Sequence, residues 1–162
     1  FSKVKSPLEF INSSYRALGA TIVDDDLPDQ MEDMAMTFFR RDEPDGYSEL
    51  GLDWVDTLSV LERVRFCQAL SDNSNRSAGS WDIQALMDRY QMTTSEDLID
   101  YFNDLLFQGL LAEGQKKLLL KFANTDEAGN PSPAESLRDS QRIERLQQTV
   151  GLLLSSPGFH FQ

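Results

Sequence analysis

Residues 93–106 read Thr-Thr-Ser-Glu-Asp-Leu-Ile-Asp-Tyr-Phe-Asn-Asp-Leu-Leu, and this stretch decides the fold class. Thr93–Glu96 has the pattern of a capping box, in which a hydroxyl and an acid three positions later satisfy the free N–H groups of a helix start. The apolar face that follows consists of Leu98, Phe102, Leu105 and Leu106. The opposite face carries Asp97, Asp100 and Asp104. This spacing is that of an amphipathic α-helix.

Similar signals occur on both sides of this stretch. Ser6–Glu9 and Ser132–Glu135 have the same capping pattern, and each has a proline after the serine. Further helices are predicted over residues 7–18, 28–39, 54–70, 80–90 and 113–122, and from Ser132–Glu135 to near Pro157. Glu43–Gly46 is predicted to be a turn, and no alternating strand pattern is present. We therefore predict an all-α fold: one helical domain over residues 1–162, a single irregular bundle of about six or seven helices with loop-rich connections.

The helix predicted over residues 54–70 is apolar on most of its circumference. Trp54, Leu58, Leu61 and Val64 form one stripe, while Val55, Phe66 and Leu70 lie on the other side. Such a distribution indicates a helix that is buried on most sides.

Composition excludes several classes of function. The chain has 162 residues, of which 40% are hydrophobic, so it can build a core rather than remain disordered. It has 27 acidic and 15 basic residues, and its formal net charge is −12. This charge disfavours binding to nucleic acid and to anionic membrane surfaces. No apolar run is long enough for a membrane span.

No convergent set of a nucleophile and a base is visible. Cys67 is the one cysteine and is interpreted as a small core residue, which excludes an internal disulfide. His160 is the one histidine, and we interpret it as a solvated side chain near the end of the chain. Ser48 is read as a turn or cap residue. The residues leave open whether the whole protein is an enzyme and favour a non-catalytic role for this portion.

Residues 124–135 partly match a twelve-residue calcium loop. Asn124, Asp126 and Glu135 occupy ligand positions, but Ala128 stands where an oxygen ligand belongs and Pro131 replaces the usual apolar residue. An ordinary loop explains the same residues, with Glu135 completing the capping box of Ser132–Glu135. We therefore expect no cofactor, and calcium is the alternative.

Two basic groups stand out in this acidic chain. One consists of Lys116, Lys117 and Lys121, and the other of Arg138, Arg142 and Arg145. We expect both to pair with acids of the same chain, and an acidic partner is the alternative.

Three phrases in order resemble the C-terminal region of the bacterial domain of unknown function 1800 family. They are Lys3–Phe10 with Tyr15–Gly19, then Pro44–Tyr47 with Asp53–Trp54 and Leu61–Phe66, and finally Leu152–Phe159. The motif positions are Lys5, Pro7, Arg16, Asp45, Gly46, Tyr47, Trp54, Arg63 and Phe66. Gly158 and Ala35 depart from the residues usual in that family.

The resemblance implies the C-terminal portion of a longer, mostly helical protein, and the first residue, Phe1, agrees with a piece of a longer chain. It also implies export, to the periplasm or the exterior of a Gram-negative bacterium. It implies no activity. The residues themselves favour structural roles, with Lys5 and Arg16 as a possible cationic side of a cleft. If Arg63 is buried, it needs a carboxylate or several carbonyls.

Three functions remain open. The first is a non-catalytic interaction or scaffold portion, which binds the upstream part of its own chain or another exported protein. The second is part of an exported hydrolase or carbohydrate-active enzyme. In that case Asp45, Glu49, Asp53 and Asp56 would complete a site built mostly upstream. The third is a calcium-stabilised helical module.

Overall fold

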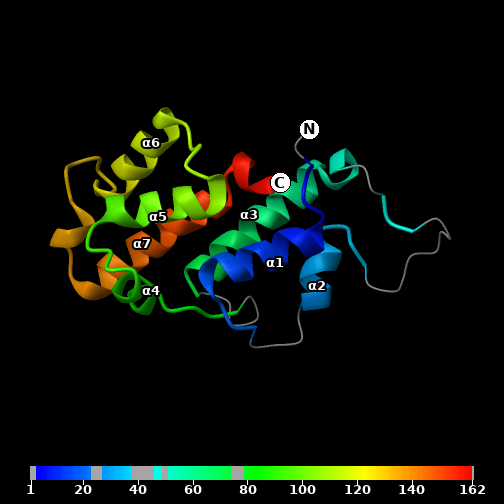
Figure 1. The fold of residues 1–162 in the computed structure, drawn as a ribbon, viewed down its shortest axis with the longest axis horizontal. Helices are drawn as coiled ribbons and strands as arrows, with labels where there is room; N and C mark the ends of the chain where they lie inside the picture. The colour runs from blue at the N-terminus through cyan, green and yellow to red at the C-terminus, as the bar shows by residue number, and fades with distance from the viewer. Residues whose placement is uncertain (1–2, 23–26, 38–45, 49–50, 74–78, 162) are drawn as a thin grey trace. The chain divides into compact units, whose positions relative to one another are not determined.

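A computed structural model describes residues 3–22, 27–37, 46–48, 51–73 and 79–161 (Figure 1). In these residues it contains α-helices and short 3₁₀ helices and no strand, only isolated β-bridges. The all-α fold class is therefore confirmed. None of the helices in these ranges combines the length and the apolar character needed to cross a membrane.

The chain divides into two compact units. Unit 1 comprises residues 1–81 and 154–162, and unit 2 comprises residues 82–153. The prediction of one domain stays a prediction. The helices of unit 1 are α1 (Pro7–Leu18), α2 (Leu27–Asp33), η1 (Gly51–Trp54), α3 (Thr57–Ser71) and η4 (Pro157–His160). Those of unit 2 are α4 (Ile83–Arg89), α5 (Ser95–Phe107), α6 (Glu113–Ala123), η3 (Ala134–Ser136) and α7 (Asp139–Leu154), whose last residue belongs to unit 1.

Helix α1 follows its local sequence signals closely. Ser6 is the N-cap, Glu9 completes the capping box, and Pro7 is the first helical residue. Gly19 ends the helix with a φ of 60°, a left-handed conformation that glycine adopts without a Cβ penalty. The predicted bounds of this helix are confirmed because each signal lies within the helix or next to it.

Helix α3 differs from its prediction in both start and orientation. Trp54 belongs to η1, and α3 begins at Thr57 after the N-cap Asp56. The predicted stripe was wrong, since Leu58 and Leu61 are 61% and 44% exposed. The buried face consists of Ser59, Arg63, Phe66, Cys67, Leu70 and Ser71. A helix with apolar residues on most sides gives no clear sequence signal for which side faces inward.

Several other helix starts and ends also differ from the sequence prediction. Helix α2 ends at Asp33 rather than Phe39, which lies outside the described residues. Ser80 pairs its backbone with Thr21, so Asp82 caps α4 instead. The N-cap of α5 is Thr94, one residue later than predicted.

Each unit has its own apolar core. In unit 1, α1 packs against α3 through the Phe10 and Phe66 rings, whose centroids are 6.3 Å apart. In unit 2 the fully buried apolar residues come mainly from α5 and α7. They are Leu98, Ile99, Phe102, Leu146, Val150 and Leu153.

Candidate functional site

Three basic side chains lie inside unit 1, and we call them the basic cluster: Lys5, Arg63 and His160. Lys5 directly precedes the N-cap of α1, Arg63 lies on α3, and His160 ends η4. Their exposed fractions are 8%, 1% and 8%. Residues so polar are rarely this buried, which makes the cluster the most unusual polar feature of the described residues.

The segments before α1 and around η4 meet at this cluster. The Lys5 N–H donates to the His160 carbonyl at 2.8 Å, and Val4 forms an antiparallel bridge with Phe161. The capping box of α1 sets the chain direction directly after Lys5. Backbone pairing therefore positions two of the three basic residues.

Within the described residues, the hydrogen bonds that the Lys5 and Arg63 side chains donate go to backbone carbonyls. Lys5 Nζ donates to the Phe159 carbonyl at 2.7 Å. Arg63 Nη2 donates to the Lys5 carbonyl at 2.9 Å and to the Trp54 carbonyl at 3.4 Å. Within the described part of the chain, Arg63 Nε, Arg63 Nη1 and His160 Nε2 are buried without a hydrogen-bond partner.

Aromatic rings form the apolar side of the cluster. The Phe10 ring centroid lies 5.0 Å from the Arg63 guanidinium carbon and 5.0 Å from the His160 ring centroid. The Phe159 ring centroid lies 3.7 Å from Lys5 Nζ. These cation–π contacts offset only part of the lost hydration of the charges.

Burial shifts the titration of all three groups in the same direction. Desolvation, together with the nearby positive charge of Arg63, lowers the pKa of Lys5 to about 8. Desolvation and the charges of Arg63 and Lys5 lower the pKa of His160 to about 4. Desolvation also lowers the pKa of Arg63, which stays charged at neutral pH. At pH 7 the cluster carries two positive charges.

The interpretation of His160 as a solvated tail residue was wrong. His160 is 8% exposed and its ring contacts Phe10. Its position depends on the pairing of residues 4 and 161, which no local sequence pattern reports. The local sequence contains one indication of an ordered segment here, because proline is favoured in the first turn of a helix and Pro157 begins η4.

Cys67 lies on α3 next to the basic cluster and is completely buried. Desolvation raises the pKa of its thiol to about 12, although Ser155, Ser14 and the basic cluster act in the opposite direction. The interpretation of Cys67 as a buried core residue is confirmed.

A comparison with protein-family models identifies the chain. The model described as "Protein of unknown function (DUF1800)" matches residues 1–161. The chain belongs to the DUF1800 family. No curated protein and no solved structure was found to match it. Membership confirms the resemblance, and the family description assigns no activity to the basic cluster.

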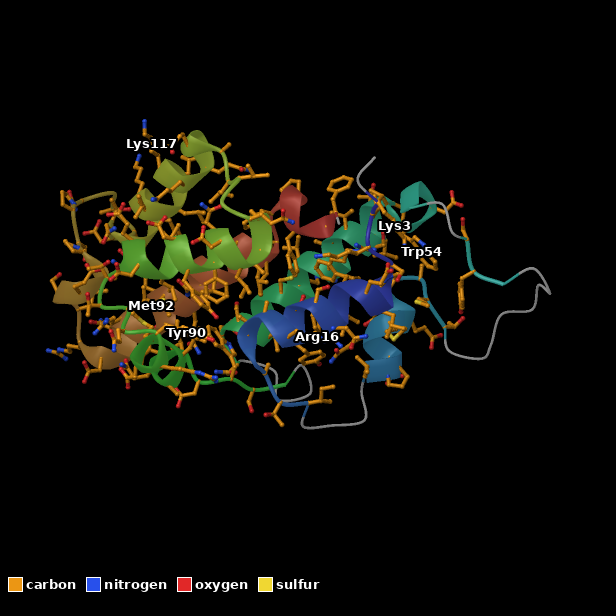
Figure 2. The ribbon with its side chains drawn as sticks, viewed as in Figure 1. Lys3, Arg16, Trp54, Tyr90, Met92 and Lys117 are labelled. Carbon is orange, nitrogen blue, oxygen red and sulfur yellow. The ribbon has the colours of Figure 1, made fainter. Side chains whose placement is uncertain are left out.

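The other motif positions of this DUF1800 chain are mostly structural. Arg16 lies exposed on α1 and does not join the cluster (Figure 2). Trp54 Nε1 donates to the Ser48 carbonyl at 3.2 Å, and its ring lies 5.6 Å from the Tyr47 ring. Gly46 has a φ of 76°. Asp45 lies outside the described residues.

The candidate calcium ligands hold the backbone of unit 2. Asn124 Oδ1 accepts from Ser95 Oγ, and Asp126 Oδ1 accepts from the Asn130 N–H. Glu135 Oε1 accepts from the Ser95 N–H at 2.6 Å. Burial is the largest single influence on Glu135 and opposes its ionisation, but hydrogen bonds from Ser95 and from the backbone of Glu135, together with the charge of Arg142, outweigh burial and lower the pKa of the carboxyl. The described residues contain no group of three His, Cys, Asp or Glu suited to a metal, and calcium stays a prediction.

The Ser132–Glu135 capping box was a wrong prediction. Residues 134–136 form the 3₁₀ helix η3, and α7 begins only at Asp139. The carboxylate of Glu135 is instead bonded to Ser95, 40 positions away in the sequence. A nonlocal hydrogen bond therefore replaces the predicted local one.

Two of the acids that would belong to a hydrolase site are described. Asp53 and Asp56 are exposed, and Asp53 accepts a hydrogen bond from Ser48 Oγ. Asp56 accepts from the Leu58 and Ser59 N–H groups as the N-cap of α3. Asp45 and Glu49 lie outside the described residues. These positions give no observation in favour of a hydrolase.

The two basic groups of unit 2 differ in their partners. Lys116 Nζ lies 2.6 Å from Asp100 Oδ1 and 3.6 Å from Glu96 Oε1. Arg145 Nη1 donates to the Ser132 carbonyl, and Arg142 Nη2 donates to the Thr93 carbonyl. The expected pairing with acids is thus confirmed for Lys116, while these two arginines donate to backbone oxygens.

Helix α6 carries an unusual surface, which we call the α6 surface: Lys117, Leu118, Lys121 and Phe122. Leu118 is 68% exposed and Phe122 is 40% exposed. They lie four residues apart, on one side of the helix. Lys117 and Lys121 are also four residues apart, and each directly precedes one of the two apolar residues. Figure 2 shows Lys117 projecting away from α6.

A groove of about 440 Å³ begins at the α6 surface. Phe122 lines it together with Leu137, Gln141 and Arg145. Asp126, Glu127 and Glu144 add acidic side chains to its wall. The apolar part of the α6 surface therefore continues into a polar groove.

Proposed function

We propose that this portion of the DUF1800 protein is a non-catalytic interaction module that docks another exported protein through the α6 surface. The observation that carries the proposal is the exposure of Leu118 and Phe122 on a helix that is otherwise rich in leucine. Large apolar side chains on one helix face are typical of sites that a partner covers.

Packing within unit 2 supports this function. Helix α6 has eleven residues, and Ala123 is its one buried residue among those described. Residues 118–120 are all leucine, yet none of them is buried. A helix with three leucines gains little hydrophobic free energy in this arrangement, and a partner would supply the missing contact.

Charge suggests the chemistry of the partner. Lys117 and Lys121 border the apolar pair, and Glu113 is the one acid in α6. The whole chain is acidic, with a net charge of −12, so a basic helix face is an exception within it. The partner surface proposed here is an apolar ridge flanked by carboxylates.

Site-specific photo-crosslinking in cells tests this docking. A photoreactive residue replaces Leu118 in the full-length protein, and a matched variant carries it at Asn12, an exposed polar position on α1. We expect a discrete adduct at Leu118, identified by mass spectrometry, and none at Asn12. Adding Lys121→Glu to the Leu118 variant should weaken the adduct. Equal adducts at both positions, or no adduct at Leu118, would contradict the proposal.

The same experiment distinguishes two sources of the partner surface. An intermolecular adduct identifies a separate protein, as proposed. A crosslink within one polypeptide would instead show that the upstream part of the same chain covers α6. That outcome would overturn the docking of a second protein.

Export is part of the proposal and has its own test. We propose that the protein acts in the periplasm or outside a Gram-negative cell, as the family resemblance implies. Fractionation of cells that express the full-length protein should place it in the periplasmic or extracellular fraction. A cytoplasmic enzyme serves as the control, and recovery of the protein together with that enzyme would contradict export.

A further inference from the structure

Among the described residues, no acid forms an ion pair with the basic cluster. The described ion pairs of unit 1 are Lys3–Glu9 and Arg65–Glu62, and neither includes a cluster residue. The hydrogen bonds that Lys5 and Arg63 donate within the described ranges go to carbonyl oxygens. Because a buried charge is costly without an opposite charge, this arrangement calls for an anion.

The acids closest in charge interaction are committed elsewhere. Glu9, which interacts electrostatically with Lys5, accepts from the Ser6 N–H and binds Lys3. Asp56, which interacts electrostatically with Arg63, caps α3. Neither carboxylate can turn to the cluster without giving up a helix cap, and loss of a cap destabilises the helix.

Arg63 also has unused donors. It is 1% exposed, yet Nε and Nη1 have no hydrogen-bond partner within the described part of the chain. A guanidinium is well suited to oxyanions because its N–H groups are fixed in one plane. Unused buried donors next to two positive charges are the features of an anion site.

The balance of charge selects the class of anion. At pH 7 the cluster holds two positive charges, on Lys5 and Arg63, while His160 is neutral. A carboxylate would leave one of these charges unbalanced. A doubly charged oxyanion would balance both.

We propose that the basic cluster binds a doubly charged oxyanion, such as phosphate or sulfate, through the charged groups of Lys5 and Arg63. Residues 4–6 and 157–161 adjoin the cluster and are joined by the backbone bond from Lys5 to His160. The proposal requires these two segments to separate so that an anion can reach Arg63. This site is independent of the α6 surface, so either proposal can fail alone.

Titration calorimetry of the chain with inorganic phosphate tests the site. Sulfate forms a second arm, and sodium chloride at equal ionic strength is the reference. We expect saturable binding of one anion per chain and a rise in Tm that grows with anion concentration above the Kd. In Arg63→Met the affinity should fall at least about tenfold, since a hydrogen bond to a charged group is lost.

Matched variants separate specific binding from a general salt effect. Arg65→Met removes an exposed guanidinium on the same helix, and we expect it to bind phosphate as the wild type does. Lys5→Met provides a second cluster variant if Arg63→Met fails to fold. Equal responses of the wild type and the cluster variants would overturn the proposal. The same holds for a wild-type chain whose Tm is no higher in phosphate or sulfate than in chloride.

Discussion

Lysine residues in the two units have opposite surroundings. Lys5 in unit 1 is 8% exposed and donates to a carbonyl, and desolvation lowers its pKa to about 8. Lys116 in unit 2 lies on α6 and binds two carboxylates of α5. Its hydrogen bond to Asp100 raises its pKa. Lys116 is stabilised by two acids of this chain, whereas Lys5 forms no ion pair with an acid among the described residues.

The difference between paired and unpaired lysines indicates where a ligand would bind. Charges that are paired at the surface add little to stability and need no further partner. Charges that are buried without an acid lower stability and are therefore rarely retained for stability alone. The comparison makes the basic cluster, rather than the surface ion pairs, the place to expect a ligand.

The largest expected effect concerns the ring beneath the basic cluster. Phe10 is fully buried and contacts Arg63, His160, Phe66 and Phe159. Phe10→Ala should lower the free energy of unfolding by about 3–5 kcal/mol, because it leaves a cavity in the core of unit 1. Urea unfolding followed by circular dichroism measures the change.

The matched control lies in the other unit. Phe122→Ala on the α6 surface should lower the free energy of unfolding by only about 1 kcal/mol, because the ring is 40% exposed and leaves no closed cavity. If both substitutions cost the same, Phe122 is packed in solution, and the contrast between the two units fails.

A smaller loss is expected at the nonlocal cap of α5. Glu135→Gln removes the charge that accepts the Ser95 N–H, and the cost should be about 1 kcal/mol. Glu127→Gln, on the wall of the groove near α6, is the control and should be neutral. Equal urea midpoints for both variants would show that Glu135 does not cap α5.

The pH dependence of stability tests the surroundings of His160. The pKa of His160 in the folded state, about 4, lies below the ordinary histidine value of 6.5, so the unfolded chain binds the proton more readily. Stability should therefore fall as the pH drops from about 6.5 towards about 4. Urea midpoints measured across this range should decline more steeply for the wild type than for His160→Gln. If the urea midpoints of the wild type and of His160→Gln declined in parallel, His160 would be exposed to water rather than buried.

The two lysines should respond oppositely to removal of their charge. Lys5→Met removes a desolvated charge and should raise the urea midpoint at pH 7. Lys116→Met removes a surface ion pair and should lower the midpoint slightly, and added salt should diminish this loss. A decrease for both variants would mean that Lys5 already has an anionic partner in the purified protein.

The smallest expected effect is that of calcium. Asn124, Asp126 and Glu135 use their oxygens to hold the backbone of unit 2, so we expect equal Tm values in calcium and in chelator. A rise in Tm with calcium that Asp126→Asn abolishes would instead support the calcium loop.

The sequence predicted features whose cause is local. The start and end of α1 follow from Ser6, Pro7, Glu9 and Gly19, which act within a few residues of each other. The burial of Leu98 and Phe102 likewise follows from the period of α5. The ends and the buried face of such helices are determined by residues of the helix itself.

Features that depend on distant residues were missed. The capping role of Glu135 needed Ser95, and the burial of His160 needed Lys5 and Phe10. The inward face of α3 could not be chosen because apolar side chains surround that helix. The candidate site belongs to this second class: the resemblance singled out Lys5 and Arg63, but nothing in the sequence joined them to His160.

The pairing of residues 4 and 161 has a consequence for biosynthesis. Lys5 and Phe159 are 154 positions apart, and unit 2 lies between them in the chain. During translation unit 2 can emerge from the ribosome before the residues that cover Arg63 exist. A nascent chain therefore holds its basic cluster open until residues 157–161 are made, and contacts of such long sequence separation form late in folding. Closure of this cluster would report that the whole of unit 2 has already been synthesised.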